Sequence, residues 1–374
     1  MSFGNKMPKL HMGDLEIEKP IIQGGMGIGV SLAGLATAVA NEGGVGVISG
    51  TVIGMLEPDF DKDFSGANKR AFRREIVKAR QMTKGVIGVN LMVALTDYMD
   101  IFQIAIEEGA DIVFVGAGLP TALPDSILEG QKGSGKAGTK VVPIVSSARA
   151  ARVIFQYWKK HFGRVPDGVV VEGPLAGGHL GFSREQIDDP AYALEQILPE
   201  VVSVVKPHEE AYGNIPVIAA GGIFSGVDIR QFLQLGADGV QMATRFVATH
   251  ECDAAREFKE AYVRCTKDDL VIIDSPVGLP GRAIRNSFLT DVMGGKRMPY
   301  RCYWHCLKSC DYQGAPYCIC EALKNAKLGD LGRGFAFAGA KTYMVDSIVS
   351  VKELMETLAR EYEEAQLVRS YPDS

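Results

Sequence analysis

The sequence predicts an α/β protein built on a (β/α)8 TIM barrel, with a smaller accessory Cys-rich lobe. Short apolar segments alternate with helical patterns along most of the first 250 residues, at a spacing of roughly 25 to 35 residues. Eight such segments can be counted, which is the number of strands that closes this kind of barrel. The segments also lack polar alternation, as expected for parallel strands buried on both faces.

The eight predicted strands are centred near residues 21, 46, 87, 113, 143, 170, 217 and 241. Amphipathic patterns between them predict helices over residues 31–42, 68–82, 98–108, 148–162, 191–205 and 227–235. An open doubly wound sheet is the alternative fold. It would also place a ligand at the carboxyl ends of its strands.

The strand–helix alternation stops after Thr249. Residues 275–313 are rich in Gly, Pro and Cys, and they show no regular pattern. Residues 351–366 have apolar positions at helical spacing, so we expect a last helix that packs back on the barrel. The expected domains are a barrel of residues 1–255 plus about 331–374 and an accessory lobe of about 256–330, which starts with a helix over 254–263 and contains the Cys-rich segment 302–320.

Composition excludes several classes of function. The chain has 374 residues, 47% of them hydrophobic, and a net charge of −5, so it lacks the basic surface of a nucleic-acid-binding protein. No apolar run reaches the roughly 18 residues that a membrane span needs, and residues 1–10 lack the apolar core of a secretory signal. We therefore expect a cytoplasmic protein that acts on a small molecule. Oligomeric state has no signature in the sequence, and a homodimer remains open.

Glycine-rich motifs follow several of the predicted strands, where barrels carry their active sites. Residues 23–27 read QGGMG, whose glycine spacing does not fit the dinucleotide-binding fingerprint. Residues 130–137 read GQKGSGKA and nearly spell a phosphate-binding P-loop. Ala137 replaces the required Ser or Thr, and the run follows a helical segment, so we interpret it as a solvated loop.

The sequence EGPLAGGHLG at residues 172–181 directly follows the sixth predicted strand. His179 has glycines close on both sides, and on such exposed backbone its imidazole can reach a ligand. We take His179 as the candidate catalytic residue. A structural role, in which the histidine braces the loop, is the alternative.

Two further motifs follow the seventh and eighth predicted strands. They read AAGGI at residues 219–223 and QMATRF at residues 241–246. Glycines before a helix start, together with the hydroxyl of Thr244, offer donors for a phosphate at the place where barrels commonly bind one. These motifs imply a phosphate-bearing cofactor.

Together these runs resemble the nitronate monooxygenase family, also called 2-nitropropane dioxygenases. The resemblance rests on PIIQGGMG, GVNLM, EGPLAGGHLGF, AAGGI and GVQMATRF, covers about residues 20–250, and continues through SPVGLPGR at 275–282. Close relatives of this family include the flavin-dependent enoyl-acyl-carrier-protein reductases.

The resemblance implies a barrel that binds FMN without a covalent bond, with His179 beside the reactive ring. It places Gly24, Gly25 and Met26 against the isoalloxazine, and Asn90 and Glu172 near its polar edge. It places Gly221, Gly222, Ala243 and Thr244 at the phosphate, and the same motifs add Gly177, Gly178, Gln241 and Met242 to the cofactor-binding set. Ala243 departs from the pattern, because many members of the family have Gly there, and its methyl group could crowd the phosphate.

The resemblance implies oxidation of alkyl nitronates with O2 as the first choice of reaction. An NAD(P)H-dependent reduction of an enoyl thioester or another alkene is the alternative, and a flavin protein for electron transfer or sensing is the second alternative. A flavin performs the electron transfer in each case, so the protein must supply orientation and a proton-transfer group. His179 fits that role, because an imidazole titrates near neutral pH.

Five of the seven cysteines fall within residues 302–320. Cys302, Cys306 and Cys310 recur every four residues, so we expect them on one face of a helix. With Cys318, or Cys320 instead, they provide the four thiolates of a [4Fe–4S] cluster. Zinc with help from His305, redox-active thiols and reduced structural cysteines are the alternatives. A cluster would favour a reductase over an oxygen-using enzyme.

Overall fold

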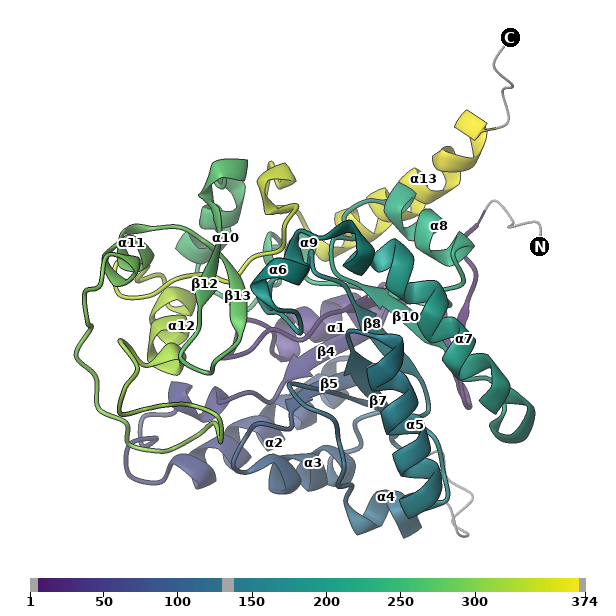
Figure 1. The fold of residues 1–374 in the computed structure, drawn as a ribbon, viewed down its shortest axis with the longest axis horizontal. Helices are drawn as coiled ribbons and strands as arrows, with labels where there is room; N and C mark the ends of the chain where they lie inside the picture. Colours follow the sequence, from purple (N-terminus) through teal and green to yellow (C-terminus); the bar gives the residue numbers. More distant parts are fainter. Residues whose placement is uncertain (1–5, 130–137, 370–374) are drawn as a thin grey trace.

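A computed structural model describes residues 6–129 and 138–369, and it shows a central barrel surrounded by helices (Figure 1). Eight parallel strands form the barrel in the order β3-β11-β10-β8-β7-β6-β5-β4. They are β3 (Ile21–Gln23), β4 (Gly46–Ser49), β5 (Ile87–Met92), β6 (Ile112–Gly116), β7 (Lys140–Val145), β8 (Val169–Glu172), β10 (Val217–Ala220) and β11 (Gly239–Met242). Each lies at a predicted position, so the (β/α)8 fold is confirmed. The P-loop-like run at 130–137 lies outside the described residues.

The first two barrel strands, β3 and β4, meet and close the barrel. The backbone N–H of Gln23 donates to the carbonyl of Val45 at 2.9 Å, and the N–H of Val45 donates to the carbonyl of Ile21 at 2.9 Å. The side chain of Gln23 is fully buried and adds a third bond, because its Oε1 accepts the N–H of Val47 at 2.9 Å. Closure leaves no strand edge in the barrel.

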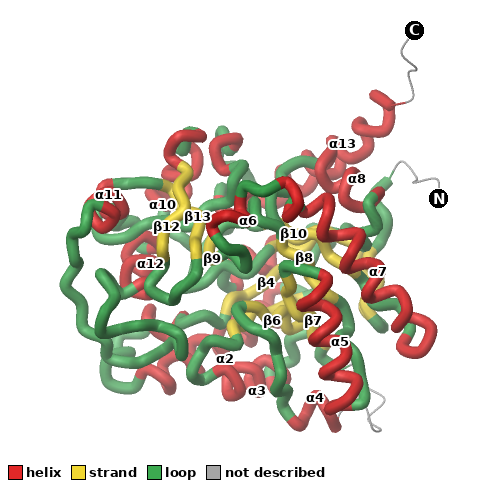
Figure 2. The backbone as a smooth tube through the Cα atoms, in the orientation of Figure 1, coloured by secondary structure: helices red, strands yellow, loops and turns green. Residues whose placement is uncertain are grey.

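Helices cover the outside of the barrel (Figure 2). They are α1 (Ala33–Asn41), α2 (Phe64–Met82), α3 (Tyr98–Glu107), α4 (Asp125–Glu129), α5 (Ala148–Phe162), α7 (Leu194–Tyr212), α8 (Gly226–Gln234) and the C-terminal α13 (Val351–Arg369). Helix α13 packs back on α8 as expected, and the N–H of Gly226 donates to Glu361 at 2.7 Å. In the described part of the chain, no helix has the length and apolar character to cross a membrane.

A hairpin that sequence analysis did not predict packs against residues at the amino ends of the barrel strands. It consists of β1 (Leu10–Met12) paired with β2 (Leu15–Ile17). Leu10 and Met12 are buried and belong to the same apolar cluster as the inward-facing strand residues Val47, Phe114 and Val170. Because the hairpin covers this end, a ligand has access to the barrel from the carboxyl ends of the strands.

The accessory residues, about 256–330, contribute to a small antiparallel sheet that joins the barrel. Strand β12 (Leu270–Asp274) pairs with β13 (Pro280–Ile284), and β13 pairs in turn with β9 (Gly178–His179) in the loop after β8. Three helices flank this sheet: α10 (Arg256–Val263), α11 (Ser287–Met293) and α12 (Ile319–Lys327). The domain boundaries themselves remain a prediction.

The predicted helix through Cys302, Cys306 and Cys310 is wrong, because residues 301–310 form an irregular loop. Backbone groups that a helix would use internally bond to the loop after β5 instead. The N–H of Thr96 donates to the carbonyl of Cys306 at 3.1 Å, and the N–H of Lys308 donates to the carbonyl of Ala94 at 2.8 Å. A four-residue spacing is therefore not sufficient evidence for a helix here.

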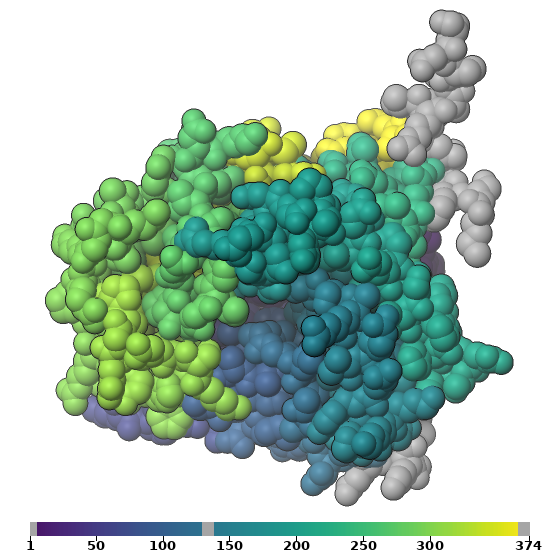
Figure 3. Space-filling view, viewed as in Figure 1, coloured from purple at the N-terminus to yellow at the C-terminus, as the bar shows by residue number. Residues whose placement is uncertain are grey.

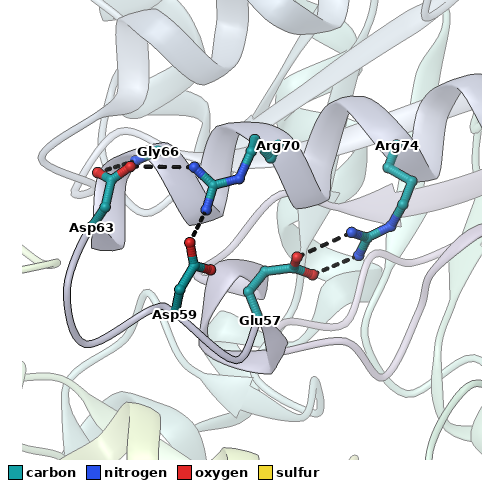
Figure 4. Close-up of polar contacts among 6 residues, drawn as sticks. All are labelled: Glu57, Asp59, Asp63, Gly66, Arg70 and Arg74. Carbon is teal, nitrogen blue, oxygen red and sulfur yellow. Dashed lines mark hydrogen bonds and ion pairs between the residues drawn. The ribbon is translucent and has the colours of Figure 1, made fainter.

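An ion-pair network fixes the segment between β4 and α2, which includes the 3-10 turn η1 (Ile53–Leu56). Figure 4 shows its members, Glu57, Asp59, Asp63, Gly66, Arg70 and Arg74. Asp63 caps α2 by accepting the N–H of Gly66 at 3.0 Å. Arg74 binds both carboxylate oxygens of Glu57, at 2.7 and 3.1 Å. Charge pairing thus attaches this segment to the first turns of α2.

We predict that Gly46→Ala destabilises the fold. A Cβ at Gly46, in β4, would collide with the backbone of Ala36 in α1, and such overpacking costs about 1–3 kcal/mol or more. Gly138→Ala is the matched control, because a Cβ there meets nothing within 4 Å. Urea denaturation gives the free energy of unfolding of each variant. Equal values for the two variants would contradict this account of the α1–β4 packing.

Candidate active site

Four neighbouring strands bring the predicted motifs together at the open end of the barrel. Glu172 of β8 pairs with Ala220 of β10, which pairs with Gln241 of β11. Gln23 of β3 pairs with Met242, the next residue of β11. Because these residues end their strands, the loops that follow lie side by side. Figure 3 shows a hollow on the face of the molecule between the accessory residues and the barrel loops.

The glycines after β3 adjoin two of the other predicted cofactor-binding segments. A Cβ at Gly25 would collide with the Cβ of Asn90, so glycine is required at this position for Asn90 to pack. A Cβ at Gly24 would lie 3.4 Å from the Cβ of Ala243 and 3.5 Å from Cγ of Gln241. The methyl group of Ala243 therefore lies beside Gly24. These residues are neighbours although they come from β3, β5 and β11.

The turn after β10 forms a cradle of backbone groups. Gly221 and Gly222 have φ values of +92° and +81°, which favour glycine. A Cβ at Gly221 would lie 2.8 Å from the carbonyl oxygen of Gly173. A Cβ at Gly222 would lie 2.8 Å from Cβ of Leu175. Among the described residues, the N–H groups of Gly222 and Ile223 have no hydrogen-bond partner. Free N–H groups in such a turn suit an anion.

The turn after β11 lies on the other side of this cradle. The short helix α9 (Thr244–Val247) begins after Ala243. A Cβ at Gly339 would lie 2.6 Å from the hydroxyl oxygen of Thr244, and a Cβ at Gly177 would lie 2.6 Å from the backbone N of Gly339. The backbone around Gly339 therefore packs between these two predicted cofactor-binding segments, a contact that sequence analysis missed.

His179 is held by the accessory sheet. It lies in β9 and pairs with Gly281 of β13. Its Nε2 is within hydrogen-bond distance of the Ser275 hydroxyl oxygen, at 2.7 Å, and its ring packs edge-on against Phe337, with 4.9 Å between the ring centres. Ser275 is buried and lies at the turn between β12 and β13. The histidine is thus fixed in orientation by two residues, Ser275 and Phe337, that lie far later in the chain.

Burial sets the charge of His179. The ring keeps some exposed surface but is densely surrounded by protein, and this desolvation lowers its pKa from 6.5 to about 4. The imidazole is therefore neutral at pH 7. Because Ser275 occupies Nε2, Nδ1 is the ring nitrogen that has no hydrogen-bond partner among the described residues.

Glu172 is a second titratable group at the carboxyl ends of the strands. Burial raises the pKa of its carboxyl from 4.5 to about 7. The described residues offer this carboxyl no hydrogen bond. A group with such a pKa can carry or release a proton near neutral pH, as proton-transfer residues in active sites do.

Arg282 fixes the loop that carries the glycines before His179. It is buried, and its Nη1 donates to the carbonyls of Pro174 and Ala176, both at 2.7 Å. Sequence analysis quoted Arg282 and Ser275 only as part of a longer run and gave them no role. Their partners lie about a hundred residues earlier, so no local pattern could reveal the contacts.

Met26 and the cysteines complete the placement of the predicted site residues. Met26 is half-buried after β3, and its N–H donates to the Ser31 hydroxyl at 2.8 Å. The five clustered cysteines instead line a separate pocket on the accessory segment. The structure therefore brings the flavin-type motifs together and leaves the cysteines apart from them.

Comparisons with known proteins identify relatives of this chain. A 5-hydroxy-7a-methyl-1-oxo-octahydro-1H-indene-4-carboxyl-CoA dehydrogenase of Mycobacterium tuberculosis is 29% identical over 281 residues, which are 75% of this chain and 67% of the relative. A probable nitronate monooxygenase of Staphylococcus aureus is 27% identical over 311 residues, covering 74% of this chain and 78% of the relative.

Solved structures show the same fold. FabK from Thermotoga maritima superposes with a TM-score of 0.71 at 29% identity and covers 95% of this chain and 96% of its own. A nitroalkane oxidase from Streptomyces ansochromogenes has a TM-score of 0.70 at 24% identity, with 95% and 98% covered. The profile of the nitronate monooxygenase family matches residues 9–361. The chain therefore belongs to the nitronate monooxygenase family and is a flavin-dependent oxidoreductase.

Proposed function

We propose that this protein binds FMN at the carboxyl ends of the barrel strands and oxidises alkyl nitronates with O2. One observation carries the proposal. A cradle of free N–H groups after β10 and a neutral, fixed imidazole at His179 lie at the same end of one barrel. The free N–H groups suit a phosphate, and the imidazole suits proton transfer beside a redox-active ring.

The described residues fit FMN. Gly222 and Ile223 present unpaired N–H groups to a phosphate, and Thr244 adds a hydroxyl from the neighbouring turn. Gly24, beside Ala243, leaves backbone rather than a side chain facing the ring. When bound, the flavin supplies the chemistry of accepting electrons from the substrate and passing them to O2.

His179 has the properties that a nitronate requires. A nitronate is an anion, and a neutral imidazole held at Nε2 can offer Nδ1 to it as a hydrogen-bond or proton-transfer partner. Glu172, with a pKa of about 7, is partly protonated at neutral pH. A protonated carboxyl avoids the repulsion that an ionised one would exert on an anionic substrate.

Reduction of an enoyl thioester by NAD(P)H is the second candidate. It is favoured by the 29% identity to a dehydrogenase of a carboxyl-CoA compound and to FabK. That reaction needs a proton at the carbon next to the one that receives a hydride, and Glu172, whose pKa of about 7 leaves it partly protonated at neutral pH, could supply it while His179 offers Nδ1 as a hydrogen-bond partner. The same geometry serves both reactions, so substrate must be tested directly.

The two reactions are separated by the compound that reduces the bound flavin. The holoprotein is mixed without oxygen with propyl-2-nitronate or with NADPH and NADH, and flavin absorbance is followed by stopped flow. We expect rapid bleaching by the nitronate, and oxygen uptake once air is admitted. Bleaching by a nicotinamide alone would overturn nitronate oxidation in favour of the reductase. A released cofactor whose mass is not that of FMN would overturn the cofactor assignment.

We predict that His179→Ala lowers turnover by about 10²- to 10⁴-fold, the usual contribution of a proton-transfer residue. Bound flavin should stay at the wild-type level, because His179 is fixed by the accessory sheet and not by the phosphate cradle. Steady-state kinetics and flavin content check the two parts. Ser275→Ala should lower kcat less, because it removes only the hydrogen bond that orients the ring.

His161→Ala is the matched control for this experiment. His161 is exposed in the last turn of α5, outside the site, so both turnover and flavin content should equal those of the wild type. Full activity in His179→Ala would remove histidine from the mechanism. A wild-type protein that binds flavin but turns over neither substrate would instead favour a protein for electron transfer or sensing.

The pKa of His179 predicts a pH dependence of stability in the flavin-free protein. Between pH 6.5 and about 4 the unfolded chain binds a proton at this residue and the folded chain does not. The contribution of His179 to the free energy of unfolding therefore falls as pH falls through this range, whereas the opposite contribution of Glu172, whose pKa is raised to about 7, is the same in wild type and variant. His179→Ala lacks this contribution, so the stability difference between wild type and variant should change steadily from pH 6.5 to 4. Urea denaturation at stepped pH measures it, and a constant difference would contradict the lowered pKa.

A further inference from the structure

Five cysteines surround one pocket on the accessory segment. The cavity has a volume of about 80 Å³ and is lined by Cys302, Cys306, Cys310, Cys318 and Cys320. All five are free thiols. The first three lie on the loop over residues 301–310, and the last two lie at the start of α12, so two separate segments bring sulfur to one place.

The thiols around this pocket interact with one another. Sγ of Cys306 lies 3.5 Å from Sγ of Cys320. Cys310 and Cys318 each interact electrostatically with both Cys306 and Cys320. Cys302 interacts with Cys306 and Cys310 only, and its thiol is bonded to the carbonyl of Trp304 at 3.4 Å. Cys302 is therefore the peripheral member, which differs from the set that the four-residue spacing suggested.

Aromatic side chains form the remaining walls of the pocket. Trp304 stacks on Phe64 with 5.5 Å between the ring centres, and Tyr317 and Phe60 also line the cavity. The ion-pair network of Figure 4 fixes the segment that carries Phe60, because Asp59 is bound to Arg70 at 2.6 Å. These rings make part of the wall apolar, although Trp304 itself is 36% exposed.

Positive charge also faces the pocket. Cys318 is the N-cap of α12, so the positive end of this nine-residue helix adjoins the thiols. Lys324 and Arg301 line the cavity, together with one carboxylate, that of Glu321. Several thiolates in an apolar pocket are stable only when they bind a metal, and a helix N-terminus stabilises the net negative charge of a thiolate cluster.

We propose that Cys306, Cys310, Cys318 and Cys320 bind an iron–sulfur cluster of the [4Fe–4S] type. Within residues 6–129 and 138–369, no three His, Cys, Asp or Glu side chains are arranged to hold a metal ion. A single zinc ion would hold all of its ligands around one centre at about 2.3 Å. Each thiolate of a cluster binds its own iron, so the ligands stand farther apart. Cys306 and Cys320 must separate when each binds its iron.

The proposed cluster site lies at the same end of the barrel as the candidate active site. The carbonyl of Cys306 and the N–H of Lys308 bond to the loop after β5, the strand that carries Asn90. The cluster proposal rests on the cysteine pocket and not on the flavin site, and a cluster would favour the reductase over the oxygen-using reaction. Its failure would leave the proposal of FMN binding intact.

The test is the metal and sulfide content of the full-length protein purified without oxygen. We expect about four irons and four acid-labile sulfides per chain, after reconstitution with Fe²⁺ and sulfide if needed. We expect Cys306→Ala and Cys318→Ala each to lower both values at least fourfold while flavin content is kept. Cys302→Ala should keep at least three quarters of the iron, because its thiol is peripheral.

Cys265→Ala is the control, because this buried thiol lies outside the pocket and is bonded to the carbonyl of Thr266 at 3.3 Å. Three results would overturn the cluster. They are about one zinc per chain without sulfide, a Cys306–Cys320 disulfide in protein free of metal, and thiols that take up no iron on reconstitution. The iron and sulfide content of the wild type tests for the cluster even if a cysteine variant fails to fold.

Discussion

The pairing of β9 with β13 is the contact on which the proposed chemistry depends. It joins the loop after β8 to a strand about a hundred residues later, and it places His179 beside Ser275. Arg282 of the same strand holds the carbonyls of the preceding glycine-rich loop. The loop is therefore fixed at the edge of the candidate site, and the accessory residues form part of that edge.

The barrel supplies the second constraint, because it determines from which end a ligand can enter. The N-terminal hairpin packs against the amino-end residues of the barrel core, and the strand carboxyl ends carry the turns with free N–H groups. Two burial effects then act at this open end. Burial keeps the imidazole of His179 neutral, and burial raises the pKa of Glu172 to about 7. A phosphate cradle, a neutral base and a carboxyl that titrates near neutral pH thus result from one architecture.

All eight strands and the helices between them could be predicted, because their apolar periodicity is local. His179 could be selected because glycines flank it. Ser275 and Arg282 could not, since their partners are about a hundred residues away. The hairpin at Leu10 was missed because its two short strands stand before the strand–helix repeat, which is what revealed the equally short β3. The four-residue spacing of the cysteines led to the wrong prediction of a helix. The same spacing occurs in a loop whose backbone bonds to residues 94 and 96. The roles of the individual flavin-binding residues remain predictions.

Closure of the barrel has a consequence for how the chain is made. Strand β3 leaves the ribosome early, yet one of its two neighbours, β11, is synthesised about two hundred residues later. Until then β3 and its neighbours present an unpaired edge, which is a site of misassociation between nascent chains. Contacts of such long sequence separation also form slowly. The carboxyl end of the barrel can therefore be completed only in the second half of translation. The longer the barrel takes to close, the longer its unpaired edge stays exposed to other chains, so the solubility of the nascent chain depends on how fast the barrel closes.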